Sequence, residues 1–512
     1  MAKIKEWGDL IVLICIILEL CIWPSLPNLA GCMMTGICWF VFSRIGLDET
    51  VIKEHIFGWL VFLSMSLYRI LPLFATLLEF HSIGYNFVVP LDTYCGETIL
   101  YLFSALAFYL AINRKSYSLV WLKKILFRCG FYTLISNKVI WALGIVGLLI
   151  RIYVSGANIE TGDVVGKTLT GFTFLQYAPL LLFFPSLYSR DWEYKIISYD
   201  KKALLYLLFL IVLSFATNSR YAVLEPFGTF ALLFLLSYLN CPHSLRQNVN
   251  KKYFVWGGLF LIFIIPFISD VSLAMLATRG IRADVDKVEL FKETMDTYLD
   301  RDKMERLQRM KDAKDKIKNE MVPVYSENWS ETYVSNFALN RYCNMKVSDN
   351  TLYHAEKVGF ANKKMHDDFW TEIVAICPAP ILNFIGFDYD KDKRFSRGDK
   401  LKALSTNTLP AGSFLVTSHL ADGLVTFGYL YFPIEFLLFF IRFLFLDTFL
   451  FKYEGKTYYS AFGLITIFSF LAMFRNAGGC CDSLPYLLRG YWQDVILFTI
   501  SFYVLRKIVV KS

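Results

Sequence analysis

Charged residues are scarce in this chain of 512 residues. Asp, Glu, Lys and Arg make up 19% of it, below the roughly 25% of an average globular protein, whereas hydrophobic residues make up 56%. The hydrophobic residues gather in blocks of about 17 to 25, each long enough to cross the hydrocarbon core of a bilayer. These proportions exclude a soluble enzyme, a nucleic-acid-binding domain and a disordered scaffold. They predict an all-α polytopic membrane protein.

Several chemical motifs are also missing. The chain has no glycine-rich phosphate loop and no Walker motif, so direct use of a nucleotide is not expected. Its eleven cysteines and six histidines show no CxxC, HxH or HxxxH spacing, so we expect no metal site and no bound cofactor. A disulfide remains open among the cysteines expected outside the membrane, which are Cys95, Cys343, Cys377, Cys480 and Cys481.

Polar breaks divide the hydrophobic blocks into candidate membrane spans, about twelve in all. They cover residues 8–25, 28–43, 57–78, 97–112, 137–155, 168–187, 203–218, 221–239, 253–275, 414–446, 458–474 and 491–508. In the short loops, one side of the membrane holds 22 Lys and Arg residues and the other side holds five. Because positive residues collect in cytoplasmic loops, both termini are predicted to be cytoplasmic and residues 279–402 to face outward.

The spans and the long loop predict three parts. These are an N-terminal bundle of about nine helices (1–278), a large, mostly helical outer loop domain (279–410) and a C-terminal bundle of about three helices (411–512). Hydrophobic residues recur at helical spacing from Ala283 to Asn319, which predicts one long amphipathic helix or a helical pair. The apolar segment 371–387 contains Pro378 and Pro380 and is too short to span, so we expect it to be interfacial or re-entrant.

A few arginines lie on the side that the charge bias leaves almost uncharged. Arginines close to the membrane are costly and indicate a functional site unless they serve as surface anchors or ion-pair partners. Together they would suit a phosphate or diphosphate, which paired guanidinium donors bind well. The candidates are Arg220, Arg279, Arg282, Arg394, Arg397, Arg151 and Arg489. Inside the apolar spans, Arg69 and Arg442 could equally be structural partners of Glu435 or of other buried acceptors.

His419 and Asp422 form the second candidate feature. They are three residues apart in the segment from Ser413 to Tyr429, so they share one helix face. A carboxylate one turn from an imidazole can fix its tautomer and raise its basicity, which would make His419 a general base for a sugar hydroxyl. The alternative is a histidine that caps the start of the helix, with Asp422 as its local partner.

This arrangement resembles the bacterial Wzy-type polysaccharide polymerases, whose overall plan the O-antigen ligases share. The resemblance rests on the number of spans, on the large outer loop in the C-terminal half, and on the outer arginines beside it. Its short motifs are Ser219-Arg220 at the end of a mid-chain helix, His419, Asp422, Gly423 and Gly428 after the loop, and Leu488-Arg489-Gly490 before the last helix.

The resemblance implies a glycosyltransferase of the bacterial inner membrane that acts in polysaccharide biosynthesis. It would polymerise oligosaccharide repeat units linked to undecaprenyl diphosphate into O-antigen (lipopolysaccharide) or capsule at the periplasmic face, without a nucleotide or metal. Arg220, Arg279 and Arg282 would stabilise the diphosphate leaving group, and His419 with Asp422 would deprotonate the acceptor. The outer domain could also bind a chain-length regulator.

Three other functions remain open from the sequence. An O-antigen ligase would transfer a finished glycan to a lipid A core. A polysaccharide or lipid transporter (flippase) would carry charges along a path through the membrane and often an internal repeat, which the chain lacks. A non-catalytic assembly protein would use its outer domain only to bind a partner.

Overall fold

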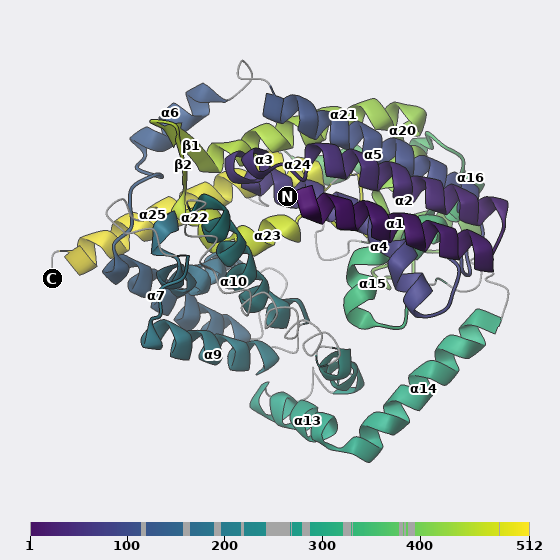
Figure 1. Cartoon of the computed structure of the whole chain (residues 1–512), viewed down its shortest axis with the longest axis horizontal. Helices are drawn as coiled ribbons and strands as arrows, with labels where there is room; N and C mark the ends of the chain where they lie inside the picture. Colours follow the sequence, from purple (N-terminus) through teal and green to yellow (C-terminus); the bar gives the residue numbers. More distant parts are fainter. Residues whose placement is uncertain are drawn as a thin grey trace. The chain divides into compact units, whose positions relative to one another are not determined.

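The computed structural model of the protein describes residues 2–113, 119–156, 164–188, 196–216, 220–241, 267, 269–278, 287–320, 329, 331–377, 382, 384, 386–387, 395–480 and 482–510. Within these ranges the chain is built almost entirely of helices, and its strands form a single two-stranded hairpin (Figure 1). The helical fold class is therefore confirmed.

Six of the described helical segments are long and apolar enough to cross a membrane. They are Leu26–Ile45, Ile56–Leu78, Pro90–Asn113, Asn137–Val154, Tyr221–Asn240 and His419–Phe449. Each overlaps a span expected from the sequence, and together they have the length and composition of membrane helices. The full count of twelve spans and the outward location of residues 279–402 remain predictions.

One predicted span is wrong, and others are shorter than a full crossing. Residues 458–474 do not form one helix, because the chain leaves a strand at Tyr459 and then forms α22 (Ala461–Ile465) and α23 (Ile467–Leu471), separated at Thr466. Within 168–187 the main element is a 3-10 helix, η2 (Thr173–Phe183), and 203–218 corresponds to the 16-residue α9 (Lys201–Ala216). Most of 253–275 lies outside the described residues.

The chain folds into two compact units, and each is discontinuous in sequence. The first unit comprises Met1–Ser118, Lys314–Asp447 and Leu471–Trp492. The second unit comprises Leu119–Ala313, Thr448–Phe470 and Gln493–Ser512. Both units therefore combine segments from early, middle and late parts of the chain.

Apolar helices make up the bundle of the first unit. Its helices are α1 (Ala2–Ile22), α2 (Leu26–Ile45), α3 (Glu49–Glu54), α4 (Ile56–Leu78), α5 (Pro90–Asn113) and α21 (Tyr431–Leu446). Helix α5 packs against both α2 and α21, and α2 also contacts α1 and α4. Hydrophobic residues that recur around these helices hold them together, since burial of apolar surface is the main stabilising term.

The first unit also contains α20 (His419–Phe427) and four helices from the predicted outer loop. The loop helices are α15 (Phe337–Cys343), α16 (Lys346–Val358), α17 (Lys363–Val374) and α19 (Arg397–Thr406). Helix α15 packs against α4. Both α16 and α17 contact α20, and α16 also contacts α19. Helix α20 ends at Gly428, whose φ of 61° favours glycine. A short turn, η5 (Gly428–Leu430), leads into α21, and the unit closes with α24 (Ser483–Pro485) and the π-helix η7 (Tyr486–Gly490).

The second unit combines helices with the hairpin. Besides η2, α9, α22 and most of α23, it contains α6 (Val120–Arg128), α7 (Asn137–Gly156), α8 (Val164–Thr170), η3 (Pro185–Leu187), α10 (Arg220–Asn240), α13 (Lys287–Leu299), β1 (Leu450–Tyr453), β2 (Lys456–Tyr459) and most of α25 (Tyr491–Val510). Helix α7 packs along η2, and the antiparallel strands pair Leu450 with Tyr459. The turn at Glu454 and Gly455 has positive φ at both residues, as tight hairpins require.

The amphipathic stretch of the long loop forms two helices. Helix α13 ends at Leu299 and α14 (Arg301–Glu320) begins two residues later, with Asp300 accepting a hydrogen bond from the amide of Lys303. Of the two alternatives left by the sequence, the helical pair is therefore the one present. The segment 371–387 is described only in part, and its first residues complete α17.

Candidate functional site

The start of α20 places His419 and Asp422 in the interior of the first unit. Ser418 caps the helix by accepting a hydrogen bond from the amide of Ala421 at 3.1 Å, and its hydroxyl also bonds that of Thr351 on α16 at 2.8 Å. His419 is 2% exposed and Asp422 is fully buried. A helix capped in this way begins at a fixed residue, so the positions of both side chains are well defined.

Asp422 is bound by a different partner from the one expected. Its Oδ1 atom accepts a hydrogen bond from Nε of Arg397 at 2.6 Å, and its Oδ2 atom accepts one from the amide of Cys480 at 2.9 Å. The expectation that Asp422 orients His419 is therefore not met. Three residues of helix place the two side chains near each other, but the carboxylate turns toward the cation on α19.

The carboxylate that faces His419 belongs to Glu435 on α21. Nδ1 of His419 lies 3.4 Å from Oε1 of Glu435, which is an ion-pair distance but long for a hydrogen bond. The Tyr431 hydroxyl and the Arg442 guanidinium also approach Glu435, yet neither of its oxygens makes a hydrogen bond of standard geometry among the described residues, although the side chain is fully buried. A buried carboxylate whose hydrogen bonds are this incomplete is rare in folded proteins and points to a functional role.

The His419 ring is also held by an aromatic side chain. It stacks on Phe474, with ring centroids 5.0 Å apart and planes 16° apart. On another side of Phe474, the guanidinium carbon of Arg69 lies 5.6 Å from the ring centroid. The ring of His419 is therefore fixed in orientation, with Nδ1 toward Glu435.

A double glycine lies against the other polar atoms of the two residues. A Cβ atom on Gly478 would lie 2.9 Å from Nε2 of His419 and 2.5 Å from an oxygen of Asp482. A Cβ atom on Gly479 would lie 2.8 Å from Oδ2 of Asp422. Only glycine allows the backbone this close, so the turn at residues 478–479 covers Nε2 and leaves no room for a larger residue.

Arg397 joins three helices at this site. Besides Asp422, its guanidinium donates to Thr426 on α20 at 2.5 Å and to Asp368 and the carbonyl of Met365 on α17. Asp368 also pairs with Lys400, one turn further along α19. The site thus holds Arg397 by a network of charge-assisted hydrogen bonds, which are stronger than neutral ones.

A second buried pair lies in the same unit. Nη2 of Arg69 bonds Oε2 of Glu97 at 2.6 Å, and the other carboxylate oxygen accepts the hydroxyl of Ser348 at 2.5 Å. The Oγ atom of Ser348 in turn accepts a hydrogen bond from Nδ2 of Asn476 at 2.8 Å. Glu97, and not Glu435, is therefore the partner of Arg69. The chain of bonds ties α4, α5 and α16 to the loop that carries the double glycine.

Arg442 lies in the span that also carries Glu435. Its guanidinium makes long contacts of 3.4 Å to Ser483 and 3.5 Å to the carbonyl of Met473, and it stacks 5.2 Å above the ring of Tyr486. Its Nε atom has no hydrogen-bond partner among the described residues. Together with Glu435, it forms a buried charged group that is only partly satisfied.

Two ionisable side chains on the loop helices, Glu356 and Tyr342, have raised pKa values. Partial burial, together with the nearby carboxylates of Asp92 and Asp349, raises the pKa of Glu356 on α16 to about 7. Burial also raises the pKa of the Tyr342 phenol on α15, while the neighbouring Arg341 and Arg475 act in the opposite direction. Two arginines therefore approach the same phenol beside the loop of residues 474–482.

The remaining predicted arginines fall in several places. Arg489 is exposed in η7, 3.5 Å from the carbonyl of Ile376. Arg151 is half-buried on α7, near Glu225 in the second unit. Arg220 begins α10, and its side chain lies outside the described part, as do Arg279, Arg282 and Arg394 entirely. Of the predicted set, the structure brings together His419, Asp422 and Arg397.

No metal site is present in the described part of the chain, where no cluster of three His, Cys, Asp or Glu side chains occurs. The ten described cysteines are free, so none of the disulfides left open by the sequence forms between them. What the arrangement can do chemically is proton transfer, with an imidazole facing a buried carboxylate.

Sequence reasoning missed two parts of this site. Glu435 was expected only as a structural partner for arginine, although a carboxylate inside an apolar span is itself a signal of function. Gly478 and Gly479 carried a signal in their adjacency after a long apolar stretch. Their contact with His419 and Asp422 depends on tertiary folding and could not be derived from spacing.

The geometry defines a helical membrane protein with a buried acid–base group at the start of an apolar span. No known protein family, curated protein or solved structure matches the chain.

Proposed function

We propose that this protein is a nucleotide-independent glycosyltransferase that joins undecaprenyl-diphosphate-linked oligosaccharide repeat units, as its resemblance to the Wzy-type polymerases implies. The observation that carries the proposal is the pair of His419 and Glu435, a buried imidazole that faces a buried carboxylate whose oxygens make no hydrogen bond of standard geometry among the described residues. The pair lies at the start of an apolar segment, where α16 and α17 of the predicted outer loop contact α20. Such a position suits a reaction between two lipid-linked substrates at the membrane surface.

In the proposed reaction, the turn at residues 478–479 moves away from Nε2 of His419, which then takes the proton from an acceptor sugar hydroxyl. The hydroxyl oxygen forms a bond to the anomeric carbon of the donor, and the bond from that carbon to the diphosphate breaks. The diphosphate leaves with the bonding electron pair. Glu435, 3.4 Å from Nδ1, stabilises the imidazolium that forms. The bonds made and broken balance without a metal or a nucleotide.

The leaving diphosphate needs cations close to the site. Arg475 precedes Asn476, in the loop whose double glycine contacts His419, and it shares Tyr342 with Arg341. Guanidinium groups suit this task because they bind phosphate oxygens in pairs. Arg397 has a different role in the proposal: Asp422, Asp368 and Thr426 occupy its donors, so it positions α20 and does not bind substrate.

The proposal is tested in a strain of the source organism that lacks the gene, complemented with variants. His419→Ala should reduce polymerisation by about 10²- to 10⁴-fold, the usual contribution of a general base. Glu435→Gln, which keeps the shape of the side chain, should reduce it by a smaller factor. The readouts are the glycan length distribution on gels and the rate at which membranes extend repeat-unit lipid extracted from the deletion strain.

His354→Ala is the matched control. His354 is also a buried histidine of the first unit, with Nδ1 2.6 Å from the hydroxyl of Ser405 and its ring stacked on Trp329, but it is not part of the His419 group. The control should lose stability and keep its rate per folded molecule. The proposal fails if His419→Ala is expressed normally and extends repeat units at the wild-type rate.

A further inference from the structure

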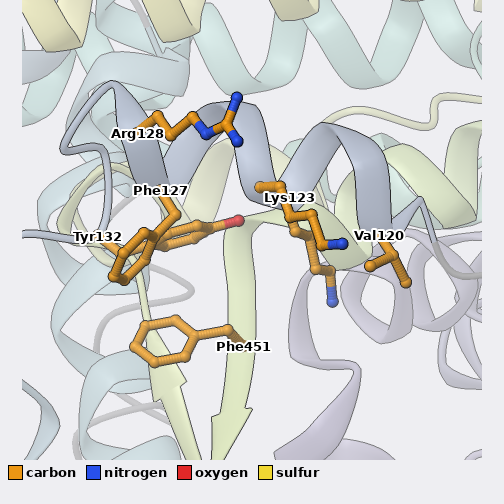
Figure 2. Close-up of a pocket in the computed structure, with 7 residues that line it drawn as sticks. Val120, Lys123, Phe127, Arg128, Tyr132 and Phe451 are labelled. Atoms are coloured by element: carbon orange, nitrogen blue, oxygen red, sulfur yellow. The ribbon is translucent and has the colours of Figure 1, made fainter.

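A pocket in the second unit lies outside the acid–base site and is lined mainly by α6. It has a volume of about 270 Å³, and three of its lining residues are the cations Lys123, Lys124 and Arg128. The opposite wall is aromatic: Figure 2 shows the rings of Phe127, Tyr132 and Phe451 gathered on one side of the pocket and the Lys123 side chain on the other. A cavity with this lining offers positive charge beside an apolar surface.

Helix α6 has the pattern of a helix that lies at a membrane surface. Leu122 and Leu126, one turn apart, are buried and anchor the helix to the unit. Its outer faces carry large apolar side chains, with Trp121 56% and Phe127 70% exposed. Exposed aromatic residues mixed with basic ones are typical of helices that rest in the headgroup region.

The floor of the pocket comes from the hairpin. Phe451 on β1 lines it, and the hydroxyl of Tyr132 donates to the carbonyl of Thr448 at 2.5 Å, which holds the segment after α6 against the hairpin. Tyr132 also packs on Phe451, with ring centroids 4.9 Å apart. The aromatic wall is therefore fixed, and the exposed cations Lys124 and Arg128 stand on a rigid support.

We propose that this pocket binds the phosphate headgroup of an anionic phospholipid. The cations attract the phosphate, and two exposed apolar side chains of the same helix, Phe127 in the pocket lining and Trp121 outside it, accept the start of the acyl chains. A free phosphate would use the cations but would leave these apolar side chains in water. The lining of the pocket therefore favours a lipid over a soluble anion, and the inference does not depend on the proposed glycosyl transfer.

The test uses the full-length protein purified in a mild detergent, with lipid binding measured by native mass spectrometry. The probe is dioctanoyl phosphatidylglycerol, compared with dioctanoyl phosphatidylcholine. The double variant Lys124→Gln/Arg128→Gln should bind the anionic lipid about 30-fold more weakly, since each cation at a membrane surface contributes about 1 kcal/mol to such binding. Both side chains are exposed, so the fold should be retained.

A matched control removes the same charge elsewhere. Lys363→Gln/Lys364→Gln changes two exposed lysines at the start of α17 and should leave the affinity for phosphatidylglycerol unchanged. Equal affinity of the wild type for the two lipids would overturn the proposal, as would wild-type binding by the Lys124/Arg128 variant. Complete displacement of the lipid by excess inorganic phosphate would also overturn it and would indicate a site for a soluble anion.

Discussion

Replacing either partner of the Arg397–Asp422 ion pair should destabilise the protein, and the two substitutions should lower the unfolding free energy by different amounts. Arg397 is 6% exposed and Asp422 is fully buried, so removing either partner takes a counter-charge away from a charged group in the interior. Such a loss costs about 3 to 5 kcal/mol of unfolding free energy. The contacts around the pair decide which substitution lies at each end of that range.

Asp422→Asn should be the milder change. Arg397 then keeps Asp368 at 3.2 Å as a counter-charge and Thr426 as an acceptor, so a loss of about 3 kcal/mol is expected. Arg397→Met leaves Asp422 with the amide of Cys480 as its remaining donor among the described residues, and a loss of about 5 kcal/mol is expected. The double variant should lose about 2 to 3 kcal/mol less than the sum of the two, because each single loss includes the penalty of an orphaned partner.

The assay is denaturant unfolding in mixed micelles, followed by the fluorescence of the eleven tryptophans. Arg309→Met is the control: Arg309 pairs with Glu305 at 3.0 Å, but the side chains are 78% and 66% exposed, so its loss should stay within about 0.5 kcal/mol. Strict additivity in the double variant would refute the reasoning, since it would mean that the two side chains are not coupled. A larger loss for Asp422→Asn than for Arg397→Met would refute the ranking.

Two further predictions concern the loop helices and the double-glycine loop. Because the pKa of Glu356 is about 7 in the folded protein and lower in the unfolded chain, its stabilising contribution is present at acidic pH and is lost as the pH rises through 7. Glu356→Gln should therefore flatten the fall in melting temperature between pH 5 and pH 8; an unchanged slope would contradict this. Thr426→Cys should form a disulfide with Cys480, whose Sγ lies 3.9 Å from Oγ1 of Thr426, and should block glycosyl transfer until a reductant is added. The block is expected because the loop of residues 474–482 must move to uncover His419. Full activity of the oxidised variant would contradict this prediction, and so would the same block in Thr426→Cys/Cys480→Ser, which cannot form this disulfide.

Composition and periodicity were sufficient for the helical class and for most of the apolar helices. A run such as residues 57–78 is apolar around the whole helix, and α4 follows it almost residue for residue. The run at 458–474 is equally apolar but begins with Tyr458 and Tyr459, whose β-forming tendency and pairing with β1 keep the chain extended. Hydropathy alone does not separate such a hairpin and two short helices from one span.

The sequence was enough to single out two residues of the candidate site, but it did not predict which side chains they contact. His419 and Asp422 stood out because they lie near the start of an apolar run, and the structure places both in the interior. Their partners, Glu435 and Arg397, lie 16 and 25 residues away in sequence and on other helices, so helical spacing carries no information on the contacts. Only the packing of α17, α19 and α21 around α20 decides which carboxylate meets which cation.

Two buried carboxylates of the first unit, Glu97 and Glu435, differ in how completely they are hydrogen-bonded. Arg69 donates to Glu97 and to two backbone carbonyls, and both carboxylate oxygens of Glu97 are hydrogen-bonded, so this pair stabilises the packing of α4 and α5. Glu435 is just as buried, and His419, Tyr431 and Arg442 all approach it, yet none of them makes a hydrogen bond of standard geometry to its oxygens. The neighbouring helices α5 and α21 therefore carry one buried carboxylate whose hydrogen bonds are complete and one whose hydrogen bonds are not. Incomplete hydrogen bonding of a buried carboxylate gives less stability than the Glu97 pair provides, and the proposed role of Glu435 in proton transfer rests on this difference.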